Sequence, residues 1–114
     1  MPETPPRIAR AKMSPEERHL RSQLVQLLSG VGLMRATLNQ RQKVCGKPGC
    51  RCARGEKHSA LYVVASEDGK PQQLFVAHTL EPQVRQWVSS YQRIRELLEE
   101  LSRIYWDKLS RREP

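Results

Sequence analysis

The chain has 114 residues, a length typical of one small domain, and only 5% of them are aromatic, so its hydrophobic core is expected to be thin. Its net charge of +8 favours polyanionic partners, and no apolar run approaches the roughly 20 residues of a membrane-spanning helix. The basic start lacks the apolar stretch of a secretory signal, and an odd number of cysteines, three, argues against a disulfide framework. We therefore expect a cytoplasmic protein in a reducing compartment.

The N-terminal part of the chain predicts a tail followed by a helix. Residues 1–13 contain three prolines and several charges, which predicts a disordered basic tail, and residues 14–111 are expected to form a single small domain. A helix is predicted over residues 14–29, with Ser14 at the N-cap and Glu17 completing a capping box. The spacing of four apolar residues gives this helix one buried stripe: Leu20, Leu24, Leu27 and Val31.

A short strand and a cysteine-rich segment follow. Residues 33–44 alternate in polarity, which favours a strand. Residues 45–58, "CGKPGCRCARGEKH", hold every cysteine of the chain. Three thiolates and one imidazole are a standard ligand set for structural zinc, so we predict a zinc-binding knuckle. Its predicted ligands are Cys45, Cys50, Cys52 and His58.

Two other interpretations of the cysteines stay open, free thiols in a basic surface loop and a redox or nucleophilic cluster. The histidine is the weakest of the four predicted ligands. The fourth position could instead be filled by His78, by water or by another chain.

The charge of the chain is concentrated around the cysteines. From Arg35 to His58 there are seven basic residues and one acidic residue, a net charge of +6 out of +8. Such single-signed charge is typical of phosphate binding, although solubility and compensation of the thiolates would also explain it. Residues 45–58 contain no aromatic side chain, so this segment gives no indication of base stacking. The predicted phosphate contacts are Arg41, Lys43, Lys47, Arg51, Arg54 and Lys57.

A β-hairpin is predicted over residues 61–77. Two β-rich runs, "LYVVA" and "QLFVA", flank Asp68-Gly69, a strong turn sequence. A hairpin of two strands is marginal in water, so it must pack on another element.

The chain ends in a long helix, predicted over residues 80–111 and about 45 Å in length. Its apolar positions follow a heptad pattern: Leu80, Val84, Trp87, Tyr91, Ile94, Leu98, Leu101 and Tyr105. The helix over residues 14–29 is about half as long, so it can cover only half of this seam. We expect the hairpin to cover the proximal part and a second copy of the chain to pair with the distal part, unless the end of the helix frays. The predicted oligomer interface is Leu98, Leu101 and Tyr105.

Three stretches of the sequence resemble a family of short uncharacterised bacterial and archaeal proteins. They are "MRATLNQRQKVCGKPGCRCARGEKH", the hairpin "YVVAS…DGK…FV" and "VRQWVSSYQRIRELLEELS", and together they span roughly residues 30–105. Members of this family carry a Cys-Gly-Lys-Pro-x-Cys-x-Cys-Ala motif and are often encoded beside transposases. The resemblance implies zinc binding and an association with mobile DNA, and it implies no established activity.

These features together predict an α+β fold: a helix, a short strand, a cysteine knuckle, a hairpin and a long helix. The predicted function is non-enzymatic binding of nucleic acid, more specifically DNA, by a zinc-stabilised accessory or regulatory protein of a mobile element. The alternative is a protein-interaction adaptor that acts through its long helix. A minor alternative is a thiol-based redox sensor.

Overall fold

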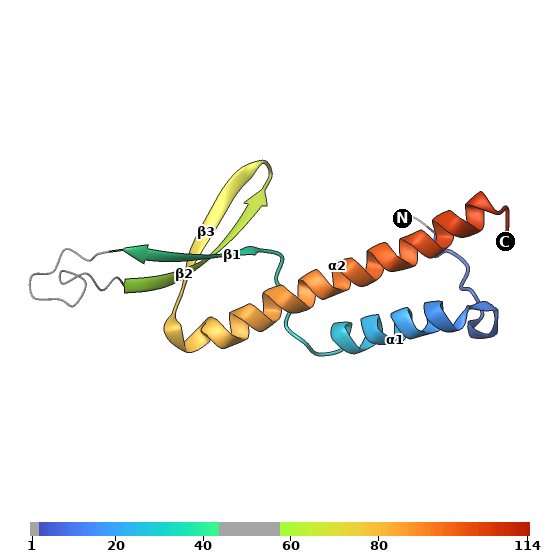
Figure 1. Ribbon diagram of the computed structural model, residues 1–114, viewed down its shortest axis with the longest axis horizontal. Helices are drawn as coiled ribbons and strands as arrows, with labels where there is room; N and C mark the ends of the chain where they lie inside the picture. Colours follow the sequence, from blue (N-terminus) through green and yellow to red (C-terminus); the bar gives the residue numbers. More distant parts are fainter. Residues whose placement is uncertain (1–2, 44–57) are drawn as a thin grey trace, which may run out of the picture. The chain divides into compact units, whose positions relative to one another are not determined.

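The computed structural model describes residues 3–43 and 58–114, and it confirms the α+β arrangement of an N-terminal helix, a sheet and a long C-terminal helix (Figure 1). The chain divides into two compact units. The helical unit comprises Met1–Val31 and Arg93–Pro114, and the sheet unit comprises Gly32–Gln92. Helix α2 (Glu81–Ser110) contributes residues to both units. That the chain forms one domain, with a disordered tail before it, stays a prediction.

Helix α1 (Pro15–Leu28) begins where the sequence predicts, one turn after a short 3-10 helix, η1 (Arg10–Lys12). The Ser14 hydroxyl accepts a hydrogen bond of 3.1 Å from the backbone N–H of Glu17. This bond satisfies one of the N–H groups in the first turn that have no partner within the helix. The second half of the predicted capping box does not form. The Glu17 side chain is fully buried and bonds to other side chains of the helical unit instead.

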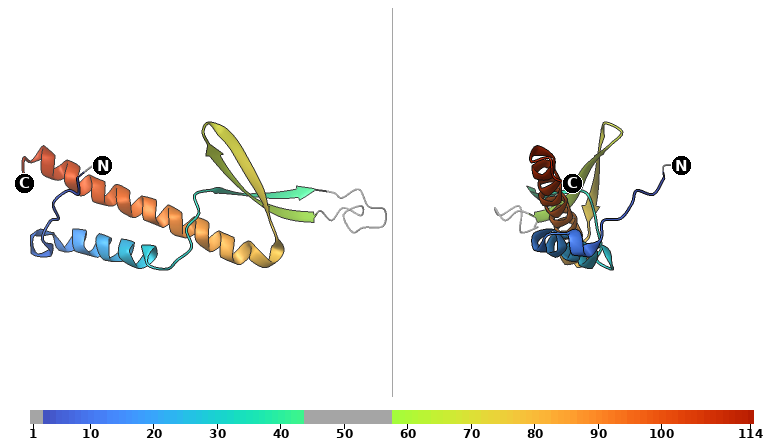
Figure 2. Two further views of the ribbon diagram at one scale, coloured as in Figure 1. Left: turned by 180° about the vertical axis from the view of Figure 1, so that it is seen from behind. Right: turned by 90° about the vertical axis from the view of Figure 1, so that its right-hand side faces the viewer.

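The core of the helical unit lies between α1 and the second half of α2, which run side by side (Figures 1 and 2). Leu20 and Leu24 of α1 are buried, and Leu27 and Ile104 pack at the margin. From α2 the buried residues are Ile94, Leu97 and Leu101. The expectation that this distal part of the long helix lacks a partner within the chain is therefore wrong, because α1 covers it.

The predicted heptad seam is wrong at several positions. Leu97 is completely buried, whereas Leu98, which the seam includes, is 52% exposed. The seam also omits Val88, which is buried against the sheet, and it includes Leu80, which is 46% exposed. A strict repeat of seven residues assumes one partner along the whole helix. Helix α2 has two different partners, a sheet and then a helix, and each selects its own face.

The sheet unit contains three antiparallel strands in the order β1-β2-β3: β1 (Thr37–Lys43), β2 (His58–Glu67) and β3 (Lys70–Val76). The predicted hairpin is confirmed. Asp68 and Gly69 both have positive φ, 52° and 76°, as a two-residue type I′ turn requires. Strand β2 begins three residues before the predicted hairpin and includes His58, and a 3-10 helix, η3 (His78–Leu80), leads into α2.

One face of the sheet packs on the first half of α2, as expected for the proximal part of the seam. Leu61, Val63 and Val76 of the sheet are buried together with Val84 and Val88 of α2. Figure 2 shows the sheet beside this part of the helix. This packing defines the inner face of the sheet, and the side chains that alternate with these buried residues lie on the opposite face.

Two contacts join the chain before β1 to Trp87 of α2. The Met34 N–H donates a hydrogen bond of 3.1 Å to the Trp87 carbonyl. A Cβ atom at Gly32 would overlap the Trp87 indole, so glycine is needed there for close approach. Within the described residues, no helix combines the length and the apolar character needed to cross a membrane.

Candidate functional site

The predicted metal motif lies between two strand ends that the sheet holds together. Lys43, the last residue of β1, pairs with His58, the first residue of β2. Antiparallel partners have Cα atoms about 4.5–5.5 Å apart, so the two described residues that flank residues 44–57 lie next to each other. The predicted residues Cys45, Lys47, Cys50, Arg51, Cys52, Arg54 and Lys57 lie outside the described part of the chain.

The described residues contain no group of three or more His, Cys, Asp or Glu side chains that could hold a metal ion. Because every cysteine lies outside those residues, zinc stays a prediction. Both histidine candidates for the fourth ligand lie at one end of the sheet. His58 begins β2, and His78 follows β3 two residues after Val76, the partner of Leu61. The His78 side chain is 75% exposed and its Nδ1 lies 3.1 Å from Glu81 Oε1.

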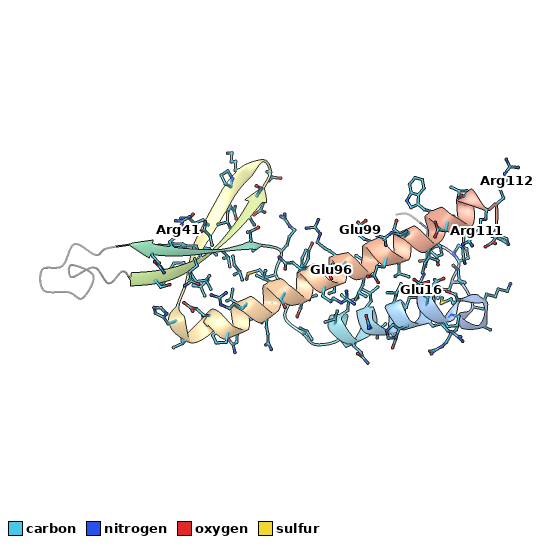
Figure 3. All side chains as sticks on the ribbon, in the orientation of Figure 1. Glu16, Arg41, Glu96, Glu99, Arg111 and Arg112 are labelled. Atoms are coloured by element: carbon cyan, nitrogen blue, oxygen red, sulfur yellow. The ribbon has the colours of Figure 1, made fainter. Side chains whose placement is uncertain are left out.

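Arg41 is the predicted phosphate contact whose side chain the described part of the structure defines (Figure 3). Its guanidinium carbon lies 4.4 Å from the centroid of the Tyr62 ring on β2, within the range of a cation–π interaction. Its Nη2 donates a hydrogen bond of 2.6 Å to Gln73 Oε1 on β3. Arg41 therefore reaches across all three strands on the face of the sheet that does not contact α2.

The same face carries two aromatic rings that the sequence analysis does not select. Tyr62 of β2 and Phe75 of β3 are register partners. Their ring centroids lie 5.7 Å apart at an interplanar angle of 68°, an edge-to-face arrangement. Phe75 is 58% exposed. Arg41, Tyr62 and Phe75 together form a cationic and aromatic surface, which we call the platform.

The helical unit contains a cluster of charged groups around Glu17. Glu17 Oε2 accepts hydrogen bonds of 2.8 Å from Arg21 Nε and 2.6 Å from the Tyr105 hydroxyl. Burial raises the pKa of the Glu17 carboxyl, but the hydrogen bonds from Tyr105 and Arg21 outweigh burial, so that pKa lies below its ordinary value. Lys108 Nζ lies 4.0 Å from the other oxygen, Oε1. This cluster fastens α1 to α2, and its paired carboxylate has a structural role.

The predicted oligomer interface divides into buried and exposed residues. Leu101 is packed in the core of the helical unit, and the Tyr105 hydroxyl is bonded to Glu17 and Arg21. Leu98 is exposed and lines a hollow with Trp106 and Leu109, which are 71% and 72% exposed. The exposed apolar surface of this part of α2 is therefore centred on Leu98, Trp106 and Leu109.

A family model described as a domain of unknown function, DUF6788, matches residues 13–86. The chain belongs to this family. The DUF6788 match begins just before α1, contains the whole sheet and ends inside α2. It confirms an uncharacterised family, whereas the cysteine motif and the neighbouring transposase genes stay predictions. No curated protein and no solved structure matches the chain.

Proposed function

We propose that this DUF6788 protein is a small, non-enzymatic nucleic-acid-binding protein that contacts phosphate through β1 and residues 44–57. The observation that carries the proposal is the net charge of +6 between Arg35 and His58. The strand register supports it, because Arg41 and Lys43 of β1 lead directly into the basic segment and Lys43 pairs with His58 at its end. Phosphate binding needs cations gathered in one place, and Arg41 and Lys43 lie on the strand that leads into the basic segment.

A zinc ion held by Cys45, Cys50, Cys52 and His58 would order the segment and fix its cations relative to the sheet. Metal binding would then contribute to folding at this end of the sheet unit. The proposal extends to a cytoplasmic accessory protein of a mobile element, as the family resemblance implies.

Salt-dependent retention of nucleic acid tests this function. If about five cations meet phosphates, the slope of log K against log salt is expected to be about −4 to −5 on duplex DNA and about −3 to −4 on single strands. Lys43→Glu with Arg51→Glu should weaken binding to all sequences about equally, because phosphate contacts carry no base identity. Titrations by fluorescence anisotropy at several salt concentrations measure both effects.

A matched pair of substitutions in the tail is the control. Arg7→Glu with Arg10→Glu changes the net charge by the same amount, at exposed residues of the helical unit. Equal losses from the two double variants would show generic attraction to a basic protein. No retention by the wild type near physiological salt would instead favour the adaptor, for which the exposed Trp106 and Leu109 are the supporting observation.

Self-association is proposed as a companion property, through the apolar surface of Leu98, Trp106 and Leu109. The wild type is expected to sediment as a dimer at tens of micromolar, and Leu98→Asp should shift it to monomer because a charge would enter the interface. Val25→Asp is the matched control, since Val25 is a similarly exposed apolar residue on α1 (62% exposed). A monomeric wild type in analytical ultracentrifugation would contradict this proposal.

A further inference from the structure

We propose that the platform of Arg41, Tyr62 and Phe75 stacks unpaired nucleobases, so that the preferred ligand is single-stranded nucleic acid. This inference rests on the proposed nucleic-acid binding and adds the class of ligand. It adds base contacts by the rings of β2 and β3 to the phosphate contacts proposed for β1 and residues 44–57, and Arg41 belongs to both.

The strand register defines which side chains share the platform face. Leu61, Val63 and Val76 are buried against α2, and side chains alternate along a strand, so Tyr62 and Phe75 belong to the opposite face. The edge-to-face contact between the rings holds Phe75 against Tyr62. With 58% of its surface exposed, Phe75 offers an aromatic surface to a ligand.

Arg41 makes this surface suited to an anionic ligand. Its guanidinium lies over the Tyr62 ring and is hydrogen-bonded to Gln73, so it is held in place before a ligand arrives. A guanidinium has five N–H donors, and such a group beside an aromatic ring can contact a phosphate next to a stacked base. Arg35, exposed and bonded to the Ser66 carbonyl, adds a cation near the turn end of the sheet.

The charge of the platform face in the described strands also suits a nucleic acid. Within the described strands, no residue that shares this face with Tyr62 and Phe75 is acidic. Glu67, at the end of β2, falls on the opposite face by alternation. A surface that binds a protein partner would be expected to carry charges of both signs. The cations and aromatic rings on this face instead match the phosphates and base rings of a nucleic acid.

The chemistry selects unpaired bases. Every base has a π face that can stack on an aromatic side chain without regard to sequence, and in a duplex those faces are already stacked on neighbouring base pairs. The exposed Phe75 ring, next to Tyr62 and the Arg41 guanidinium over it, therefore gains contacts from a single strand that it cannot gain from a duplex.

Substitution of Phe75 tests the proposal. Fluorescence anisotropy would measure binding of a labelled DNA single strand of about 12 nucleotides, the same sequence as RNA, and the DNA duplex. Phe75→Ala is expected to weaken binding of the single strand by about 5- to 100-fold while leaving duplex binding and the salt slope unchanged. Phe75→Tyr, which keeps the ring, should retain the affinity. The DNA and RNA arms show which sugar the platform accepts, and loss in either supports stacking.

Leu74→Ala is the matched control, because Leu74 is the neighbouring exposed apolar residue (69% exposed) and belongs to the other face. Should Phe75→Ala fail to fold, Phe75→Leu removes the ring but keeps the apolar bulk, with the same expected direction. Equal effects of the Leu74 and Phe75 variants, or equal losses on duplex and single strand, would overturn the platform while the salt-dependent binding stands. A wild type that binds neither form would overturn the proposed function itself.

Discussion

Leu97→Ala is expected to lower the free energy of unfolding by about 2–5 kcal/mol, the range for truncating a buried leucine. Leu97 is completely buried in the core of the helical unit, together with Leu20 and Leu24. The next residue, Leu98, is 52% exposed, so Leu98→Ala should change the free energy of unfolding by about 0.5 kcal/mol or less. Both variants make the same chemical change in one helix, so the difference between them isolates burial. Urea denaturation followed by far-UV circular dichroism measures it.

The opposite ranking would contradict the structure and support the heptad seam of the sequence analysis, in which Leu98 is packed and Leu97 is not. Repeating the measurement at several protein concentrations distinguishes packing within one chain from self-association, because the stability of a dimer rises with concentration. A Leu98→Ala effect that appears only at high concentration would therefore be evidence for self-association.

Zinc binding is expected at about one ion per chain in protein purified without chelators, and Cys50→Ser should abolish it. A structural site contributes its binding free energy to folding, on the order of 10 kcal/mol in zinc-finger peptides, so a strong chelator should lower the melting temperature. We expect the sheet unit to be affected most, since the predicted site joins the ends of β1 and β2. Elemental analysis and thermal melts with and without chelator provide the measurements.

The three histidines supply the controls for this experiment. His58→Ala should reduce the zinc content if His58 is the fourth ligand, and His78→Ala should do so if that residue takes its place. His19→Ala should leave the zinc content unchanged, because His19 lies on α1 in the helical unit. Metal-free protein whose melting temperature does not respond to chelator would contradict the zinc prediction.

Local chemistry made much of the fold predictable. A serine N-cap followed by proline defines the start of α1 to the residue, because cap and first turn involve only neighbouring residues. Asp68-Gly69 defines the hairpin for the same reason, since both residues adopt the positive φ of a type I′ turn.

Neighbouring residues do not determine which face of α2 is buried or which element packs against it. Leu97 and Leu98 are identical in the sequence, and a shift of one residue turns the buried stripe by about 100°. Only the position of α1 against the second half of α2 decides which leucine is buried. The sequence predicts a second copy as the partner of the distal part because the helix over residues 14–29 is only about half as long as the final helix, and nothing in the sequence shows which half it covers.

The pairing of the two platform rings could have been predicted from the sequence. A two-residue turn at Asp68-Gly69 pairs Glu67 with Lys70, and counting outward along both strands pairs Tyr62 with Phe75. Residues 45–58 contain no aromatic side chain, and the two rings lie outside that segment, on β2 and β3. The position of Arg41 over Tyr62 depends on the pairing of β1 with β2, which no turn sequence determines.

The two tryptophans divide between the units, and this affects how the protein is studied by fluorescence. Trp87 is half-buried in the sheet unit, next to Gly32, whereas Trp106 belongs to the helical unit and is 71% exposed. An indole that is already in water changes its emission little on unfolding, so at concentrations too low for self-association the emission change should come mainly from Trp87. A melt followed by tryptophan emission therefore reports the sheet unit, and Trp106→Phe would make it a single-site probe of that unit.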